Sequence, residues 1–369
     1  MFLNFLRTPA TAIRVNVLVD AFVTSFLAAS VGYLTVQSGI NSEDALHAVS
    51  IGIVIGTVFS LPLARIGDVV GETTALTIVQ ILQVLAYVAL GVVPESIWLL
   101  GALIGVFMLG RFVSPLRGAL PPRFLRKEEL IGFKVSLRTA TLTVVLFGTA
   151  AVPCVLYLDI SIRAAASWIG VLGYLACSLS TQELHKRRTT WVERRKSIGF
   201  RISLGTEVWT SWFKVVVTCA VIATGSTLIP YILAAKGSAF SWLLPLSLLI
   251  EIAINYAIQK NPRFSKGQSP STLMLLISAS ALGVCGGALL IGSTFLELST
   301  IALSIILIGV FCLNHTAQTL ATIMAWQLQY EKGDDKDRSY IVAIFSMASS
   351  LGVGLANFIG ASIYGGLSL

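Results

Sequence analysis

Long apolar runs separated by short polar segments repeat along almost the whole chain, from Thr11 to Gly366. An α-helix needs about 20 predominantly apolar residues to cross the hydrocarbon core of a bilayer. Most runs have about that length, and the charged residues gather between them. The pattern predicts eleven membrane-spanning helices, at 11–35, 45–66, 73–93, 97–116, 137–158, 162–180, 205–233, 238–259, 271–292, 297–327 and 340–366.

The composition agrees with this assignment. Of the 369 residues, 55% are hydrophobic and 12% are charged, and the mean hydropathy is +0.84. Soluble domains carry about 25% charged residues, roughly twice that fraction. The predicted fold class is therefore an all-α polytopic membrane protein without a separate soluble domain.

The basic residues indicate the orientation of the helices. Near the span ends, 23 Lys and Arg residues fall on one side of the predicted membrane and only Arg163 and Lys236 on the other. Cytoplasmic loops hold such an excess, so we expect a multi-pass protein of the cell (inner) membrane with a cytoplasmic N-terminus. Topology thus accounts for the net charge of +8, and no nucleic-acid partner is expected. The basic run from His185 to Lys196 is either a charged linker or a contact for anionic membrane lipid.

The chain contains an internal repeat. A shift of 194 residues lays spans 1 to 4 on spans 7 to 10, and span 5 falls on span 11 after a further slip of about ten residues. Span 6 has no counterpart, so either the natural chain ends after span 11 or the sequence is truncated. The predicted domains are an N-terminal six-helix bundle, a basic cytoplasmic linker and a C-terminal five-helix bundle, at 1–181, 182–204 and 205–369.

Short motifs accompany this repeat. The segment 64–73 reads Ala-Arg-Ile-Gly-Asp-Val-Val-Gly-Glu-Thr, and span 5 contains Gly148 and Pro153. Together with two parallel helical halves and a basic central loop, these residues resemble the major facilitator superfamily, including its drug and metabolite exporters. The family pattern between spans 2 and 3, roughly G-x-L-x-D-R-x-G-R-[RK], is matched at Asp68 and Gly71. The resemblance implies a two-bundle fold, with 6+5 helices in this chain, and a gating role for Asp68 and Gly71.

A polar stripe runs along the first span. Asn16, Asp20 and Thr24 are spaced i, i+4 and i+8, which places them on one face of a helix. The repeat sets the second half's polar residues at matching depth on span 7, namely Thr210, Lys214 and Thr218. We expect Asn16, Thr24, Lys214 and Thr218 to line a substrate cavity.

Asp20 is the first proton-coupling residue that the sequence suggests. It lies roughly 14 Å into the membrane at 1.5 Å per residue. An ionised carboxylate facing lipid there costs about 2.5 to 3.5 kcal/mol, so we expect it to face the interior and exchange protons. Its predicted partner is Lys214, in a switchable ion pair. The alternatives are a structural bond from Asp20 to a hydroxyl or to Lys214, and snorkelling of Lys214 or its pairing with Glu207.

Further polar residues lie on other spans. Glu251 on span 8 and His315 on span 10 are candidates for proton coupling, although packing and interhelical hydrogen bonding are the alternatives. Asn314 and Gln318, beside His315, are candidates for the substrate cavity. Arg111 at the end of span 4 is either a substrate residue or a topological anchor.

Several classes of activity are excluded by what the sequence lacks. Gly-Lys is absent, so there is no G-x-x-x-x-G-K-[ST] loop for ATP. The five cysteines occur singly, and no nucleophile lies beside a base, so we expect no metal, no cofactor and no enzyme activity. The predicted function is secondary active transport: proton-coupled export of a small amphipathic compound by alternating access, as in an efflux antiporter. The alternatives are an uptake symporter and a non-transporting membrane component.

Overall fold

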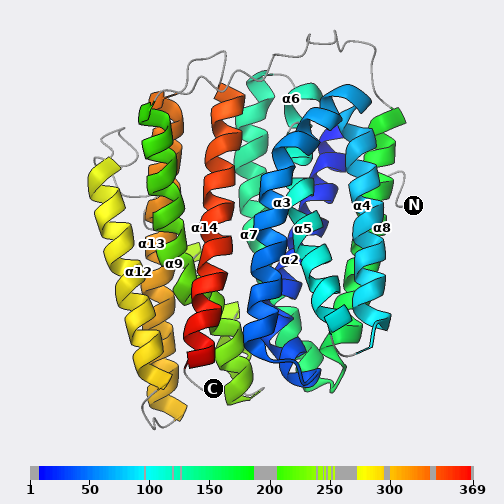
Figure 1. The fold of residues 1–369 in the computed structure, drawn as a ribbon. Helices are drawn as coiled ribbons and strands as arrows, with labels where there is room; N and C mark the ends of the chain where they lie inside the picture. Colours follow the sequence, from blue (N-terminus) through cyan, green and yellow to red (C-terminus); the bar gives the residue numbers. More distant parts are fainter. Residues whose placement is uncertain are drawn as a thin grey trace. The chain divides into compact units, whose positions relative to one another are not determined.

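The computed structural model is built from α-helices, most of them long (Figure 1). It describes residues 8–94, 97–118, 120–124, 127–186, 206–237, 272–294, 300–332 and 338–366, with short pieces between 240 and 253. The helices of the first half are α2 (Pro9–Gln37), α3 (Ser42–Val70), α4 (Glu72–Val92), α5 (Ile97–Gly118), α6 (Pro121–Phe124), α7 (Lys127–Tyr157) and α8 (Ile162–Lys186). Those of the second half are α9 (Thr206–Lys236), α12 (Thr272–Thr294), α13 (Thr300–Lys332) and α14 (Arg338–Gly366).

The helix bounds agree closely with the predicted spans. Most helices begin and end within a few residues of the apolar runs, because helical hydrogen bonding continues slightly beyond the membrane core. Several helices are longer than predicted, including α8, which ends at Lys186 instead of 180, and α13, which ends at Lys332 instead of 327. The helix α7 begins at Lys127 instead of 137, and α3 continues through Asp68 to Val70, so Asp68 is helical and not in a loop. Half of the predicted span 238–259 falls outside the described residues.

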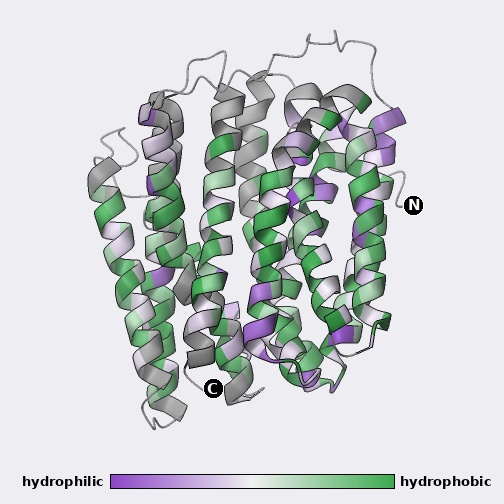
Figure 2. Ribbon diagram, in the orientation of Figure 1, coloured by the Kyte–Doolittle hydropathy of each residue, from purple (hydrophilic) through white to green (hydrophobic). Residues whose placement is uncertain are grey.

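The helices have the properties of membrane spans. Among the described residues, six helices are long and apolar enough to cross a bilayer, all of them in the first half of the chain. Figure 2 shows hydrophobic residues along much of the length of the coloured helices. Large apolar side chains such as Leu85 and Leu172 are exposed, which in a membrane places them against lipid. The chain is therefore a multi-pass helical membrane protein.

The chain divides into two compact units. Unit 1 comprises Met1–Ser30 and Ile55–Ser203, and unit 2 comprises Val31–Val54 and Leu204–Leu369. The helices α2 and α3 therefore contribute to both units. Unit 2 combines the segment Val31–Val54 with the second half of the chain, so the units do not follow the predicted boundaries at 181 and 205. Those domain boundaries stay a prediction.

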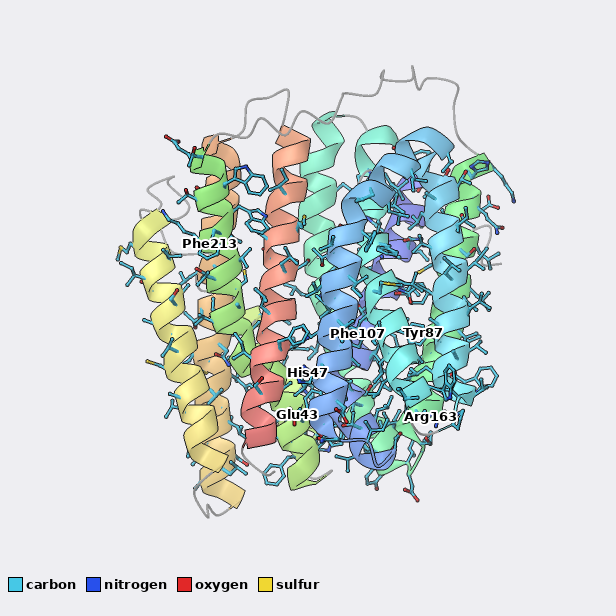
Figure 3. All side chains as sticks on the ribbon, in the orientation of Figure 1. Glu43, His47, Tyr87, Phe107, Arg163 and Phe213 are labelled. Carbon is cyan, nitrogen blue, oxygen red and sulfur yellow. The ribbon has the colours of Figure 1, made fainter. Side chains whose placement is uncertain are left out.

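In unit 1, α4 packs against α5 and α8. Its inner face carries both apolar and polar side chains, including the stacked ring of Tyr87, which Figure 3 labels. The break between α3 and α4 is the single residue Gly71, whose φ of 97° is a conformation that other residues rarely adopt. This turn at Gly71 ends α3 and sets the first residue of α4.

In unit 2, α9 packs against α14 and α12, and α12 packs against α13. The N-terminal part of α3 joins this unit through close contacts with α14. The Ser50 hydroxyl donates to the Gly354 carbonyl at 2.5 Å, and the His47 ring lies 5.3 Å from that of Phe358. Figure 3 shows His47 and Glu43 on this part of α3.

Candidate functional site

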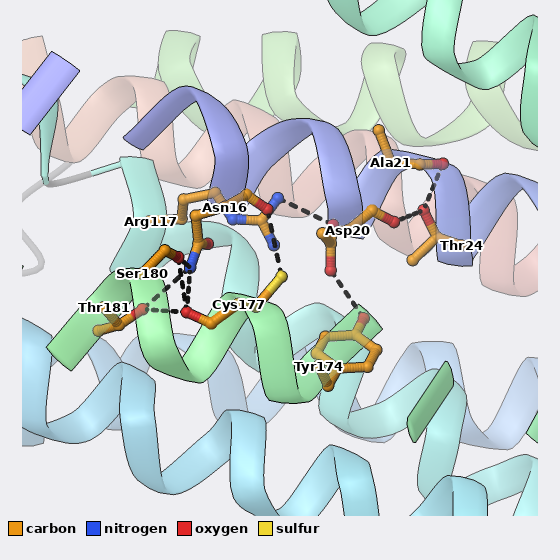
Figure 4. A network of polar contacts seen from close by, with 9 residues as sticks. All are labelled: Asn16, Asp20, Ala21, Thr24, Arg117, Tyr174, Cys177, Ser180 and Thr181. Atoms are coloured by element: carbon orange, nitrogen blue, oxygen red, sulfur yellow. Dashed lines mark hydrogen bonds and ion pairs between the residues drawn. The ribbon is translucent and has the colours of Figure 1, made fainter. Parts of the chain in front are cut away.

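Asp20 lies in an ion pair inside unit 1. Its Oδ2 atom is 2.8 Å from the Nη1 atom of Arg117 on α5, and its Oδ1 atom accepts a hydrogen bond of 2.7 Å from the Tyr174 hydroxyl on α8. Figure 4 shows these two side chains at the Asp20 carboxylate. The side chains of Arg117 and Asp20 are only 13% and 14% exposed. Three helices are therefore held together by one carboxylate.

The pair is placed deep along α2. Asp20 is the twelfth residue of a 29-residue helix, about 17 Å from its beginning at 1.5 Å per residue. The guanidinium of arginine stays protonated in proteins, so Arg117 supplies a permanent positive charge. A charge-assisted hydrogen bond and a neutral hydroxyl donor together stabilise the ionised carboxylate. Both carboxylate oxygens of Asp20 thus have a partner, and these contacts join α2 to α5 and α8.

Two further side chains surround the pair. The Tyr87 ring on α4 stacks on Tyr174 with ring centres 5.7 Å apart, and both rings are almost fully buried. Arg111, one and a half turns before Arg117 on α5, is half-buried and interacts electrostatically with Asp20. Arg111 therefore contributes positive potential at the same carboxylate.

Asn16 joins α2 to α8 one turn before Asp20. Its Nδ2 atom donates to the Cys177 carbonyl at 3.0 Å, to Ser180 Oγ at 3.1 Å and to Thr181 Oγ1 at 2.9 Å. The Cys177 thiol lies 3.5 Å from the Asn16 carbonyl, and the Thr181 hydroxyl lies 3.0 Å from Gln80 Oε1 on α4. Asn16 is fully buried in this contact, where it packs α2 against α8, and its predicted place in a substrate cavity stays a prediction.

The structure describes the surroundings of four other predicted residues. Asp20 has Arg117 and Tyr174 as partners within unit 1, and Lys214 is exposed on α9 in unit 2, so their predicted ion pair stays a prediction. Thr24 is exposed, and its hydroxyl donates to the Asp20 carbonyl at 2.7 Å. Thr218 and Asn314 are buried inside unit 2, with 1% and 3% of their surface exposed. The predicted place of Thr24, Lys214, Thr218 and Asn314 on a substrate cavity stays a prediction.

Several predicted site residues cannot be compared in this way. Glu251 lies outside the described residues. The side chains of His315, Gln318 and Asp68 also lie outside them, although their backbones are helical. Their roles in proton coupling, substrate binding and gating stay predictions. In the part of the chain that the structure describes, no cluster of His, Cys, Asp and Glu suits a metal ion.

Sequence reasoning missed the residues that complete the site. Arg117 is one of the basic residues near span ends that indicate topology, and Tyr174 lies on a span for which the sequence suggests no site residue. A periodic pattern was nevertheless present, because Tyr174, Cys177 and Thr181 on α8 are spaced i, i+3 and i+7, as are the polar residues of α4. Two polar stripes at helical spacing indicate a buried polar contact between the two helices.

Gly71 offers a first testable prediction. Because its φ is 97°, a Cβ atom at this position would be strained regardless of the space around it. We expect Gly71→Ala to lower the free energy of unfolding by about 1–3 kcal/mol. Thermal denaturation in detergent micelles would measure this, with Gly101→Ala on α5, where no atom lies within 4 Å of an added Cβ, as the control. Equal midpoints for the two variants would contradict the assigned backbone conformation.

Known structures share this arrangement of helices. No family model matches the sequence, and no curated protein matches it either. Among solved structures, an auto-inhibited POT family peptide transporter aligns with a TM-score of 0.74 over 96% of this chain and 89% of that chain, at 10% identity. A variant of the nucleoside transporter NupG aligns with a TM-score of 0.73 over 96% and 90%, at 11% identity. The POT family transporter PepTSo gives 0.74 over the same shares, at 11% identity.

These likenesses concern the fold. They confirm the predicted fold class, an all-α polytopic membrane protein with the two-bundle fold of major-facilitator transporters. The resemblance to drug and metabolite exporters within that superfamily stays a prediction, because the neighbours are peptide and nucleoside transporters.

Proposed function

We propose that this protein is a secondary active transporter that couples the movement of a small molecule to protons, with Asp20 as the coupling carboxylate. The observation that carries the proposal is the ion pair between Asp20 and Arg117, buried at depth within a transporter fold. Ionisable residues inside membrane spans are costly, and they commonly mark ion and proton pathways.

The geometry suggests how protonation drives a structural change. In the ionised state, the Asp20 carboxylate binds Arg117 and Tyr174 and so joins α2, α5 and α8. Protonation removes the negative charge and leaves Arg117 buried without a counter-charge. A buried charge that loses its partner is strongly unfavourable, so α5 is expected to shift until Arg117 finds another anion or water. Such a two-state element is what alternating access requires.

For the substrate and direction, we propose export of a small amphipathic compound. The spans are largely apolar and hold few charged residues, which suits amphipathic compounds better than sugars or phosphates. Arg111 lies near the pair, where its charge interacts with Asp20. The protein itself performs no chemistry on the substrate, needs no cofactor, and is neither an enzyme nor a partner of nucleic acid in this proposal.

Uptake by proton symport is the second candidate. The solved structures most similar in fold include peptide and nucleoside transporters, whose substrates are polar. Both candidates use the same Asp20 chemistry and differ only in the direction in which protons and substrate are coupled. For both, we propose an inner-membrane location, a cytoplasmic N-terminus and contact of the basic 182–204 segment with membrane lipid.

Proton movement in energised inside-out vesicles tests the proposal. Lipophilic cations, weak bases and uncharged drugs are added as a panel for export, and dipeptides and nucleosides as a panel for uptake. We expect a compound of one panel to change the pH gradient in wild-type vesicles, and Asp20→Asn to abolish this response because an amide cannot exchange protons near neutral pH.

The matched control is Asp159→Asn, which removes a carboxylate from the exposed turn between α7 and α8. Asparagine tolerates the positive φ of that residue, so this variant should respond like the wild type. A response that survives in Asp20→Asn would refute Asp20 as the coupling residue. Absence of any response from folded, inserted protein would favour a non-transporting component.

A further inference from the structure

Unit 1 holds a group of buried polar atoms that have no hydrogen-bond partner. Among the described residues, they include Asn16 Oδ1, Gln80 Nε2, Gln83 Oε1, the Tyr87 hydroxyl and Arg117 Nε. Asn16, Gln80 and Gln83 have exposed fractions of 0%, and Tyr87 of 1%. Buried polar groups are normally paired with protein or with internal water. So many unpaired groups in one helical unit therefore indicate a site for a polar ligand.

Three of these atoms lie along one face of α4. Gln80, Gln83 and Tyr87 are spaced i, i+3 and i+7 on α4, so they follow one another along one side of the helix. Gln80 Oε1 contacts Thr181 of α8 at 3.0 Å, and Tyr87 stacks on Tyr174 of the same helix. Gln83 Nε2 donates to the Val106 carbonyl of α5 at 3.3 Å. The face is thus enclosed by α5 and α8, with Asn16 and Arg117 adjoining it.

The unpaired atoms suit water. They include two acceptors, two N–H donors and a hydroxyl that can do either. A buried water molecule typically makes about three hydrogen bonds to such groups. We propose that internal water molecules occupy this polar seam, defined as Asn16, Gln80, Gln83, Tyr87, Arg117 and Thr181, and that they form the proton path of Asp20. The inference rests on the proposed function, since it names the route by which the coupling carboxylate exchanges its proton.

The seam leads toward the beginning of α4 and the end of α8. One turn beyond Thr181 on α8 lies His185, which is exposed. Its Nδ1 atom is 3.0 Å from the hydroxyl of Thr73, and Thr73, Thr77 and Gln80 are spaced i, i+4 and i+7 on α4. His185 therefore connects the polar face with the solvent beyond the helix ends.

Charged groups surround both ends of this route. At the His185 end, Glu72 is buried beside Thr73 on α4, while Glu183 and Lys186 of α8 pair with each other at 2.7 Å. At the other end, Asp20 faces Arg117 and Arg111 of α5, Tyr174 and Cys177 of α8, and Tyr87 of α4.

The transfer itself is a sequence of proton hops. A proton bound at His185 passes to a hydroxyl or water, which releases another proton on its far side, and the last proton binds the Asp20 carboxylate. The intermediate hydroxyls and waters are unchanged after each passage. Asp20 becomes a neutral acid, and Arg117 keeps its proton and its charge. The amides of Asn16, Gln80 and Gln83 hold the water in place without being protonated.

Time-resolved infrared spectroscopy of purified protein after a pH jump measures this transfer without any substrate. The carboxylic-acid band of Asp20 is identified as the band that Asp20→Asn removes. We expect Thr181→Val and Gln80→Leu to slow the appearance of this band by about tenfold, because each removes a group that bonds or orders the water. Thr181→Val has nearly the same shape as the native residue, so it keeps the test valid if Gln80→Leu does not fold.

The control is Thr149→Val, which removes a buried hydroxyl from α7 outside the seam. Its band should appear at the wild-type rate. If the band appears at that rate in Thr181→Val and Gln80→Leu as well, the seam is not the proton path, although Asp20 remains a coupling residue. If no band depends on Asp20 in the wild-type protein, the proposed coupling role of Asp20 fails first, and the proton path fails with it.

Discussion

Arg117→Met is expected to lower the free energy of unfolding by about 3–5 kcal/mol, because it leaves the Asp20 carboxylate buried without its counter-charge. Methionine keeps much of the length of the arginine side chain, so the loss is one of charge and hydrogen bonding more than of volume. The Tyr174 hydroxyl would remain the single donor to Asp20 among the contacts described for that carboxylate. Thermal denaturation in detergent micelles at neutral pH measures the effect.

A double variant separates the ion pair from general damage to the core. In Asp20→Leu/Arg117→Met both charges are absent, and replacing a whole buried pair by apolar residues is often neutral or stabilising. We therefore expect the double variant to be more stable than Arg117→Met. If the two single losses simply add, the residues do not act as a pair, and the structural basis of the coupling mechanism is wrong.

An exposed pair of almost the same length is the control. Lys186 and Glu183 are 2.7 Å apart on α8, but the Lys186 side chain is 68% exposed. Water and side-chain freedom reduce such a contact to less than about 1 kcal/mol, so Lys186→Met should hardly change the thermal midpoint. The contrast isolates burial as the reason that the Asp20 pair matters.

The helices could be predicted from the sequence because a bilayer demands apolar runs of a fixed length. The same argument predicted that Asp20 faces the interior, since lipid exposure of a carboxylate is costly. Its partner could not be predicted in this way. Arg117 is 97 residues away, and its position near a helix end is equally typical of a topological anchor. Only the packing of α5 against its neighbours brings the guanidinium to the carboxylate.

The internal repeat points to another residue, Lys214, as the partner of Asp20. It places Lys214 at the depth of Asp20, but depth specifies only how far along a helix a residue lies, not which way its side chain faces. By contrast, the polar spacing of Gln80, Gln83 and Tyr87 does specify a direction, because i, i+3 and i+7 share one face of a helix. The side-chain amides of Gln80 and Gln83 on an otherwise apolar span therefore indicate, from the sequence alone, a polar contact with a neighbouring helix.

Gly352→Ala is expected to destabilise unit 2 by about 1–3 kcal/mol through overpacking. Gly352 lies where α14 meets α9. A Cβ atom there would be 2.6 Å from the Val216 carbonyl oxygen and 2.6 Å from Cys219 Cβ, and 3.0 Å from the Ala220 nitrogen. Two of these atoms belong to the backbone, so they cannot move aside as a flexible side chain would. Small residues permit this close approach of helices in membranes, and adding even one methyl group forces α9 and α14 apart.

Gly309→Ala on α13 is the matched control, because no atom lies within 4 Å of an added Cβ at that position. Alanine is the better helix former by about 0.5–1 kcal/mol, so this variant should be as stable as the wild type or slightly more stable. Thermal midpoints in detergent therefore move in opposite directions for the same chemical change. If Gly352→Ala matches Gly309→Ala, α9 and α14 do not approach each other as closely as described. A drop in both variants would instead mean that helical glycines are required for reasons other than this contact.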